Sequence, residues 1–207
     1  SGLTIEAWVR SSSTAGAHTI AYKWNDDTDQ WSYIFKDHNQ LDTQRIELSS
    51  GGHSDLADLR GAASIVTEEW VHLAATYDSN TVRLYYNGVL DGTLSAPGAI
   101  HDSNALFMVG GVTGSSGLES FDGLIDEVRV WDYARSEQDI QQWMHTSLPS
   151  GKAGLVAYYT FDEGYGQIAR DLSGFGNDLT LGHFAQEDLA DPTWVGSTAP
   201  ITTGPAP

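Results

Sequence analysis

Large apolar residues alternate with polar ones along three segments of the chain, 3–10, 70–78 and 121–131. In the second segment one side would carry Trp70, His72, Ala74 and Thr76, and the other side Val71, Leu73, Ala75 and Tyr77. A period of two residues is typical of a half-buried antiparallel strand. Because Gly- and Asp-rich turns separate these segments, the pattern predicts an all-β fold with two antiparallel sheets packed as a sandwich.

The same alternation, divided at turn residues, predicts nine strands. They are Leu3–Arg10, His18–Trp24, Trp31–Lys36, Arg45–Ser49, Trp70–Asp78, Thr81–Asn87, Val89–Leu94, Ala105–Gly110 and Leu124–Asp132. The dipeptide Asn87-Gly88 is typical of a tight hairpin turn, because both central residues of that turn adopt a positive φ. The strands on either side of it are therefore predicted to be neighbours.

One short helix interrupts the β pattern. Ser136 precedes Asp139 by three residues, which is an acidic variant of the capping box. Apolar residues then recur at helical spacing, at Ile140, Trp143 and Met144. We therefore expect an amphipathic helix over Ser136–Thr146 that lies on the sandwich.

The remainder of the chain is more irregular. A strand is predicted at Gly154–Phe161, a loop at Asp162–Asn177 and a weaker strand near Leu179. The domain is expected to cover residues 1–201. Residues 202–207 belong to a tail rich in Pro, Thr and Gly, which indicates a linker.

Composition excludes several classes of partner. Among 207 residues there are 10 Lys and Arg but 28 Asp and Glu, so the net charge is −18. Nucleic acids and anionic lipid surfaces would be repelled. No cysteine is present, which excludes disulfides, and no apolar run approaches the roughly 20 residues of a membrane span. The chain begins at Ser1 rather than Met, so we expect a processed or excised part of a longer protein.

Seven segments together point to a family: TIEAWV, EWVHLAATYD, VRLYYNGVL, FDGLIDEVRVW, YARSEQDIQ, GLVAYYTFDEG and DLSGFGNDLTL. In them the chain resembles the laminin-G-like, concanavalin A-like jelly-roll modules of secreted bacterial and archaeal proteins, up to about Ile201. The resemblance implies a calcium ion at one sheet edge and a non-catalytic place in adhesins, surface proteins or polysaccharide-degrading enzymes. It also implies an extracellular location, secreted or at the cell surface.

The chain departs from this family at its start. Family members usually carry an edge segment before the strand that here begins at Leu3, and only two residues precede Leu3 in this sequence. A sheet that lacks a strand exposes unpaired N–H and C=O groups. A neighbouring copy or another domain is therefore a predicted partner, through addition of a strand.

The loop around Asp171 is the predicted calcium site. Calcium prefers six to eight oxygen ligands in a flexible shell. Gly174 would let the backbone bend so that carbonyl groups converge with Asp171 and Asn177, and Asp162 is a weaker additional ligand. The alternative is a loop without metal, because Asp, Ser, Gly and Asn are also the ordinary residues of turns.

A second cluster is the predicted ligand-binding site. Trp24 and Trp31 flank an acidic stretch that contains Asp27 and Asp29. An exposed indole can stack on the C–H face of a sugar while carboxylates accept hydrogen bonds from its hydroxyl groups. The alternatives are a solvated hairpin tip for the acids and a core position for the tryptophans.

The acidic residues near Asp126 do not favour an enzyme. Laminarinase-like glycosidases of this architecture place three acids as E-x-D-x-x-E, and Asp122, Asp126 and Glu127 lack that spacing. We therefore predict a non-catalytic, calcium-stabilised module for adhesion to a glycan or surface glycoprotein. A structural subunit assembled by strand addition and a polysaccharide hydrolase or lyase remain the alternatives.

Overall fold

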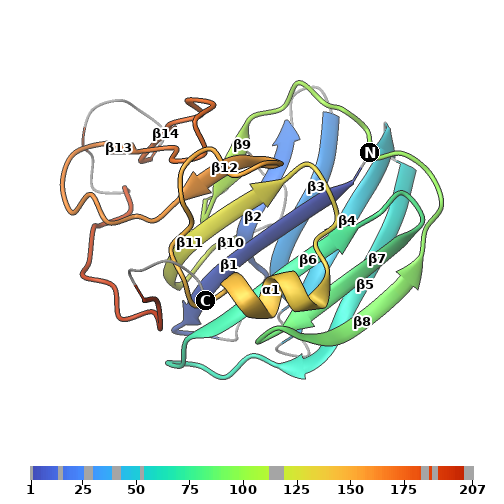
Figure 1. Ribbon diagram of the computed structural model, residues 1–207, viewed down its shortest axis with the longest axis horizontal. Coiled ribbons are helices and arrows are strands. Elements are labelled where there is room, and N and C mark those ends of the chain that lie inside the picture. The colour runs from blue at the N-terminus through green and yellow to red at the C-terminus, as the bar shows by residue number, and fades with distance from the viewer. Residues whose placement is uncertain are drawn as a thin grey trace.

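The computed structural model describes residues 2–13, 16–25, 30–38, 43–51, 54–111, 119–182, 187 and 191–202. Two sheets stack face to face (Figure 1). Sheet A has the order β12 (Leu155–Tyr159), β11 (Gly123–Trp131), β1 (Leu3–Ser11), β6 (Val71–Tyr77), β7 (Thr81–Tyr86) and β8 (Val89–Ser95). Sheet B has the order β10 (Glu119–Ser120), β2 (His18–Asn25), β3 (Gln30–His38), β4 (Thr43–Gly51) and β5 (Ser54–Ser64), with β9 (Phe107–Val109) also beside β2.

Two smaller elements complete the fold. The helix α1 (Glu137–Trp143) lies on the outer face of sheet A, and β13 (Ile168–Ala169) pairs with β14 (Leu179–Thr180) in a separate small sheet. Figure 1 shows β13 and β14 at one side of the sandwich, next to β12. We refer to residues 162–182 as the C-terminal lobe.

The predicted strands and the predicted all-β sandwich are confirmed, with three differences. The sequence analysis missed β5, whose outward residues are polar, and β10 and β13, which have only two residues each. The sheets are also not wholly antiparallel, because β10 pairs with β2 in parallel. The Asn87-Gly88 hairpin joins β7 to β8 as predicted, with Tyr86 opposite Val89.

The main core lies between the two sheets. Alternate residues of sheet A, among them Ile5, Leu73 and Val128, pack against Phe35 and Leu48 of sheet B. All five are fully buried. Because burial of one such side chain stabilises a fold by about 1.5–3 kcal/mol, this layer supplies most of the driving force for folding.

The outer face of sheet A is also covered, so the expectation of half-buried strands is wrong for β6, whose residues are all buried. Ile140 of α1 packs on Ala74 and Tyr85. The predicted capping box is confirmed, because Ser136 and Asp139 each accept a hydrogen bond from the backbone N–H of the other. The cap therefore anchors the start of a helix that supplies a third layer.

Beneath α1 lies a buried ionic cluster. Arg135 Nη1 donates to Glu6 Oε1 over 2.6 Å, and Trp131 Nε1 donates to the same oxygen over 3.0 Å. Arg129 donates to the carboxylate of Glu127 and, over 2.9 Å, to the carbonyl of Trp143 at the end of α1. Burial raises the pKa of Glu6, but Arg135 and Arg129 outweigh it and hold that pKa below its usual value. The cluster therefore holds α1 through charged hydrogen bonds.

The segment 191–202 runs from the C-terminal lobe along the sandwich to the end of α1. Ser197 donates to the carboxylate of Asp126, and Trp70 Nε1 donates to Thr198 Oγ1 over 2.9 Å. Thr202, just beyond the expected domain limit, forms a β-bridge with Thr146. Residues 203–207 lie outside the described part of the chain.

Candidate functional site

The predicted aromatic site is part of a packed cluster. Trp24 and Trp31 lie opposite each other in the β2–β3 pairing, and both pack with Tyr22, Ile34 and Met108. Trp31 is only 7% exposed and Trp24 is half-buried. Asp27 and Asp29 lie outside the described residues. The two rings serve packing as the structure describes them, and their role in binding stays a prediction.

The carboxylate of Asp171, at the predicted calcium site, is occupied by hydrogen bonds from the chain itself. Its Oδ1 accepts from the N–H groups of Tyr158 (3.0 Å) and Ser173 (2.9 Å). Its Oδ2 accepts from Ser173 Oγ (2.8 Å) and the N–H of Asn177 (2.9 Å). Burial raises the pKa of Asp171, but these hydrogen bonds outweigh it and hold the pKa below its usual value.

This loop closes the outer edge of β12. Besides the Tyr158–Asp171 contact, the N–H of Leu172 donates to the Tyr158 carbonyl over 2.8 Å, and Asn177 Nδ2 donates to the Val156 carbonyl over 2.9 Å. Gly174 has a φ of 98°, which lets the chain turn tightly there. The loop therefore takes the place of a neighbouring strand by forming hydrogen bonds with β12. This edge of sheet A is thus paired within the chain.

These residues do not fit a calcium ion as they are folded. Asp171 has no free lone pair, and the Asn177 amide is turned toward β12 with its N–H donor. Asp162 is exposed, and within the described residues no three His, Cys, Asp or Glu side chains converge on one point. The presence of calcium stays a prediction that the structure does not test.

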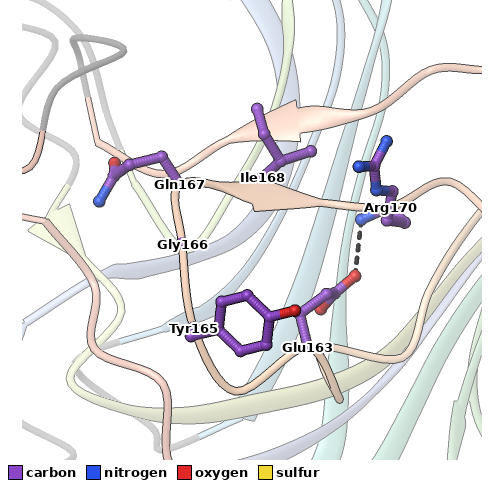
Figure 2. Close-up of a pocket in the computed structure, with 6 residues that line it drawn as sticks. All are labelled: Glu163, Tyr165, Gly166, Gln167, Ile168 and Arg170. Carbon is purple, nitrogen blue, oxygen red and sulfur yellow. Dashed lines mark hydrogen bonds between the residues drawn. The ribbon is translucent and has the colours of Figure 1, made fainter.

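A hollow of about 290 Å³ opens in the C-terminal lobe, lined by Glu163, Tyr165, Gly166, Gln167, Ile168 and Arg170 (Figure 2). These residues belong to the segment between β12 and β13, to β13 itself and to the position just after it. The hollow is at the small end of the range of ligand sites in proteins, which begins at roughly 300 Å³. It therefore offers space for a small part of a ligand rather than for an extended chain.

The ring of Tyr165 stands beside this hollow and is 84% exposed. Gly164 and Gly166 flank it with φ angles of 71° and 83°, so the backbone makes a sharp turn at the aromatic residue. Trp194 Nε1 donates to the Gly166 carbonyl over 2.7 Å, and the Trp194 ring packs on Phe161. The turn that carries Tyr165 is therefore held by Trp194, while the Tyr165 ring faces solvent.

A carboxylate, that of Glu163, and a guanidinium, that of Arg170, line the hollow together with this ring. Glu163 Oε1 accepts from the N–H of Arg170 over 2.7 Å (Figure 2). Glu163 Oε2 is shielded from water and accepts no hydrogen bond within the described residues. The guanidinium of Arg170 donates to Asp178 over 3.1 Å, and its side chain is 67% exposed. The arrangement thus combines a flat apolar ring with a carboxylate and a partly solvated guanidinium.

Tyr165 and Arg170 were not predicted from the sequence, because 162–177 was read as a loop and only its part around Asp171 was considered as a site. The run Gly164-Tyr165-Gly166 was the available signal. A large aromatic residue between two flexible glycines has few neighbours to pack against, which favours exposure.

The acids of β11 do not form a catalytic pair. Glu127 has a φ of 51° at a bulge opposite β1, and its carboxylate accepts from Arg129 and from the Tyr158 hydroxyl. Asp126 is 5% exposed and accepts from Ser197. Burial raises the pKa of Asp126 to about 6. Both carboxylates are enclosed by protein, so neither faces a space in which a glycosidic bond could lie.

The chain is similar to a known protein family over more than half of its length. A laminin-G profile, described as the Concanavalin A-like lectin/glucanases superfamily, matches residues 1–141. Pappalysin-1 of Mus musculus is 31% identical over 96 residues, 42% of this chain, and human pappalysin-1 is 28% identical over 144 residues, 65% of this chain. The matched regions are only 6% and 8% of those two proteins. The chain therefore spans less than a tenth of these relatives.

Solved structures are similar over most of the fold. A candidate carbohydrate-binding protein of Bacteroides ovatus has a TM-score of 0.73 and 26% identity, covering 88% of this chain and 52% of that protein. Domain 4 of the extracellular arabinanase AbnA of Geobacillus stearothermophilus, solved with arabinotriose, has a TM-score of 0.52 and 24% identity, covering 67% and 64%. A sialidase CBM40 of Ruminococcus gnavus, solved with α2,3-sialyllactose, has a TM-score of 0.56 and 17% identity, covering 68% and 80%. The last two show likeness of fold alone.

Proposed function

The chain belongs to the Concanavalin A-like lectin/glucanases superfamily, and from that premise we propose that it is a non-catalytic module that binds a glycan in the hollow of its C-terminal lobe. The observation that carries the proposal is the ring of Tyr165, which is 84% exposed at a fixed turn beside a carboxylate and a guanidinium. The phenol ring offers a flat apolar face, and such a face next to polar groups suits an amphipathic ligand.

A sugar ring offers the matching chemistry. One of its faces carries C–H groups, which can lie on the phenol ring of Tyr165. Hydroxyl groups at its rim can accept from the guanidinium of Arg170, and a hydroxyl that donates can use the second lone pair of Glu163 Oε1, since Oε2 is shielded. Most small-ligand sites combine an apolar surface with a few placed polar groups in this way.

Binding without turnover is the proposal because the carboxylates of the hollow and of β11 lack a cleaving arrangement. A glycosidase needs one protonated acid and a second carboxylate across the bond, about 5–10 Å apart. Asp126, whose pKa is raised to about 6, lies under Ser197 and away from solvent. In the hollow, Glu163 is the one carboxylate among the lining residues.

Two of the similar structures add support from their own ligands and names. The Bacteroides ovatus protein is a candidate carbohydrate-binding protein, and the arabinanase domain was solved with arabinotriose and belongs to an extracellular enzyme. We therefore propose an extracellular location, secreted or at the cell surface, and a role in adhesion to glycans or surface glycoproteins. The described part of the chain contains no helix long and apolar enough to cross a membrane.

The test is binding of the purified chain to a glycan array, followed by calorimetry with the oligosaccharides that bind. Tyr165→Ala should weaken their affinity about two- to tenfold, since aromatic contacts are worth about 0.5–1.5 kcal/mol. Phe175→Ala is the matched control, because Phe175 is 70% exposed in the same lobe but does not line the hollow. Equal affinities for Tyr165→Ala and the unaltered chain, or no glycan bound at all, would refute the proposed site.

A further inference from the structure

We propose that the hollow selects neutral sugars and rejects sugars that carry a carboxylate or sulfate group. This inference rests on the proposed function, because it concerns which glycan the same site accepts. It is supported by the burial, the pairing and the sign of the charged groups around Tyr165.

The first observation concerns Glu163. Its Oε1 accepts from the N–H of Arg170, and its Oε2 accepts no hydrogen bond within the described residues and is shielded from water. The carboxylate lies in the wall of the hollow and is partly shielded from solvent, so its interaction with a charged group of a ligand is screened less than it would be in bulk water. An anionic group of a ligand would be repelled, whereas a hydroxyl group would not.

The second observation concerns Arg170, which is the one cation among the described residues that line the hollow. Its guanidinium donates to Asp178 Oδ2 over 3.1 Å, and the other carboxylate oxygen of Asp178 accepts from the N–H of Asp171 over 2.9 Å. The Asp178 carboxylate offsets much of the positive charge of this guanidinium, which weakens its attraction for an anionic group of a ligand. Its remaining N–H groups can still donate to neutral hydroxyls.

The surroundings add to the negative potential. From residue 153 to the end of the chain, Arg170 is the only Lys or Arg, and the same stretch has seven acids: Asp162, Glu163, Asp171, Asp178, Glu187, Asp188 and Asp191. A local excess of acidic groups disfavours the approach of anions over distances of about 10 Å at moderate ionic strength. The Glu163 carboxylate in the hollow and the surrounding sequence are therefore both acidic, and both disfavour an anionic ligand.

The experiment compares neutral and acidic oligosaccharides of similar size on the intact chain. The neutral probes are arabinotriose, cellotriose and lactose, and the acidic probes are trigalacturonate and α2,3-sialyllactose. We expect at least one neutral probe to bind, and its binding to be weakened by Tyr165→Ala. The acidic probes should bind at least about tenfold more weakly than that neutral probe at low salt.

Two variants change charge while keeping shape. Glu163→Gln keeps an acceptor oxygen for the Arg170 N–H and removes the negative charge, so the gap between neutral and acidic probes should narrow to about threefold or less. Asp178→Asn should release the Arg170 guanidinium and strengthen acidic probes alone. Thermal melts of both variants confirm that the lobe remains folded.

The outcomes separate the two proposals. If acidic probes bind as tightly as neutral ones, or if Glu163→Gln leaves the gap unchanged, the selectivity is refuted while glycan binding at Tyr165 stands. If no probe binds, or if Tyr165→Ala has no effect, the proposed function fails and the selectivity fails with it.

Discussion

Two regions of this molecule hold aromatic side chains next to acids, and they use them in opposite ways. At the β2–β3 hairpin, Trp31 is 7% exposed and packs with Trp24 and Tyr22. In the C-terminal lobe, Tyr165 is 84% exposed and no ring packs against it within the described residues. Local composition is similar, so composition does not decide whether a ring is structural or available to a ligand.

The difference arises from what the backbone places around each ring. Pairing of β2 with β3 sets Trp24 opposite Trp31, and Ile34 of β3 and Met108 of β9 fill the remaining contacts. Tyr165 instead lies in a turn between two glycines, and its support comes from a hydrogen bond of Trp194 to the Gly166 backbone. A sheet surrounds a side chain with neighbours, whereas a supported turn can hold it without covering it.

The largest effect that tests this contrast is on stability. Trp31→Ala should lower the free energy of unfolding by about 3 kcal/mol or more, because it leaves a cavity in a packed cluster. Tyr165→Ala, the matched change of an exposed ring, should alter it by less than about 0.5 kcal/mol. Urea denaturation monitored by Trp fluorescence measures both. Similar losses for the two variants would contradict the contrast.

The second prediction concerns the loop that supports the lobe. Asp171→Asn should destabilise the fold by about 2 kcal/mol, because charged hydrogen bonds at the edge of β12 are weakened. The folded pKa of Asp171 is below its usual value. Its contribution is therefore present above the unfolded pKa of about 3.9 and is lost as the pH falls through the folded pKa.

Urea titrations at a series of pH values check this. The difference in stability between the unaltered chain and Asp171→Asn should shrink as the pH falls below about 4. Asp162→Asn, a change of an exposed acid in the same lobe, is the control and should have little effect. A difference that is constant with pH would show that ionisation of Asp171 does not stabilise the edge.

The third prediction concerns Asp126, which binds the segment that carries Trp194. Burial raises its pKa to about 6, with Glu127 and Asp162 adding to the effect, despite hydrogen bonds from Ser197 and the Glu127 N–H. Since the folded pKa exceeds the unfolded one, the contribution of Asp126 to stability is most favourable below about pH 4 and declines until about pH 6. Asp126→Asn should therefore stabilise the chain at pH 7.5 by on the order of 1 kcal/mol.

The measurement for Asp126 is the melting temperature between pH 4 and pH 8. In the variant, the part of the decline between about pH 4 and pH 6 that Asp126 causes should disappear. Asp122→Asn is the control, because Asp122 is an exposed acid near the same strand. If Asp126→Asn is less stable than the unaltered chain at pH 7.5, the ionised carboxylate stabilises the segment rather than straining it.

The contrast also shows which parts of this protein can be predicted from sequence. Period-two alternation, the Asn87-Gly88 turn and the Ser136–Asp139 cap are local signals, and each is confirmed. The lobe depends on Trp194 reaching Gly166 across 28 residues and on strands of two residues, and such contacts leave no periodic pattern. The aromatic residues were recognised as candidates at the hairpin, but their burial depends on tertiary contacts that spacing does not reveal.

The smallest effect is expected from calcium removal, which tests whether the Asp171 loop of the C-terminal lobe holds a metal ion. An ion bound only to the folded state would raise the melting temperature in proportion to the logarithm of its concentration. Because all four acceptor positions of Asp171 are filled by N–H and O–H groups, we expect excess EDTA to shift the melting temperature by less than about 1 °C. The sequence-based expectation is a fall. A fall of several degrees that added calcium reverses would mean that an ion replaces these donors, and Tyr165 would then be supported by a metal-bound loop.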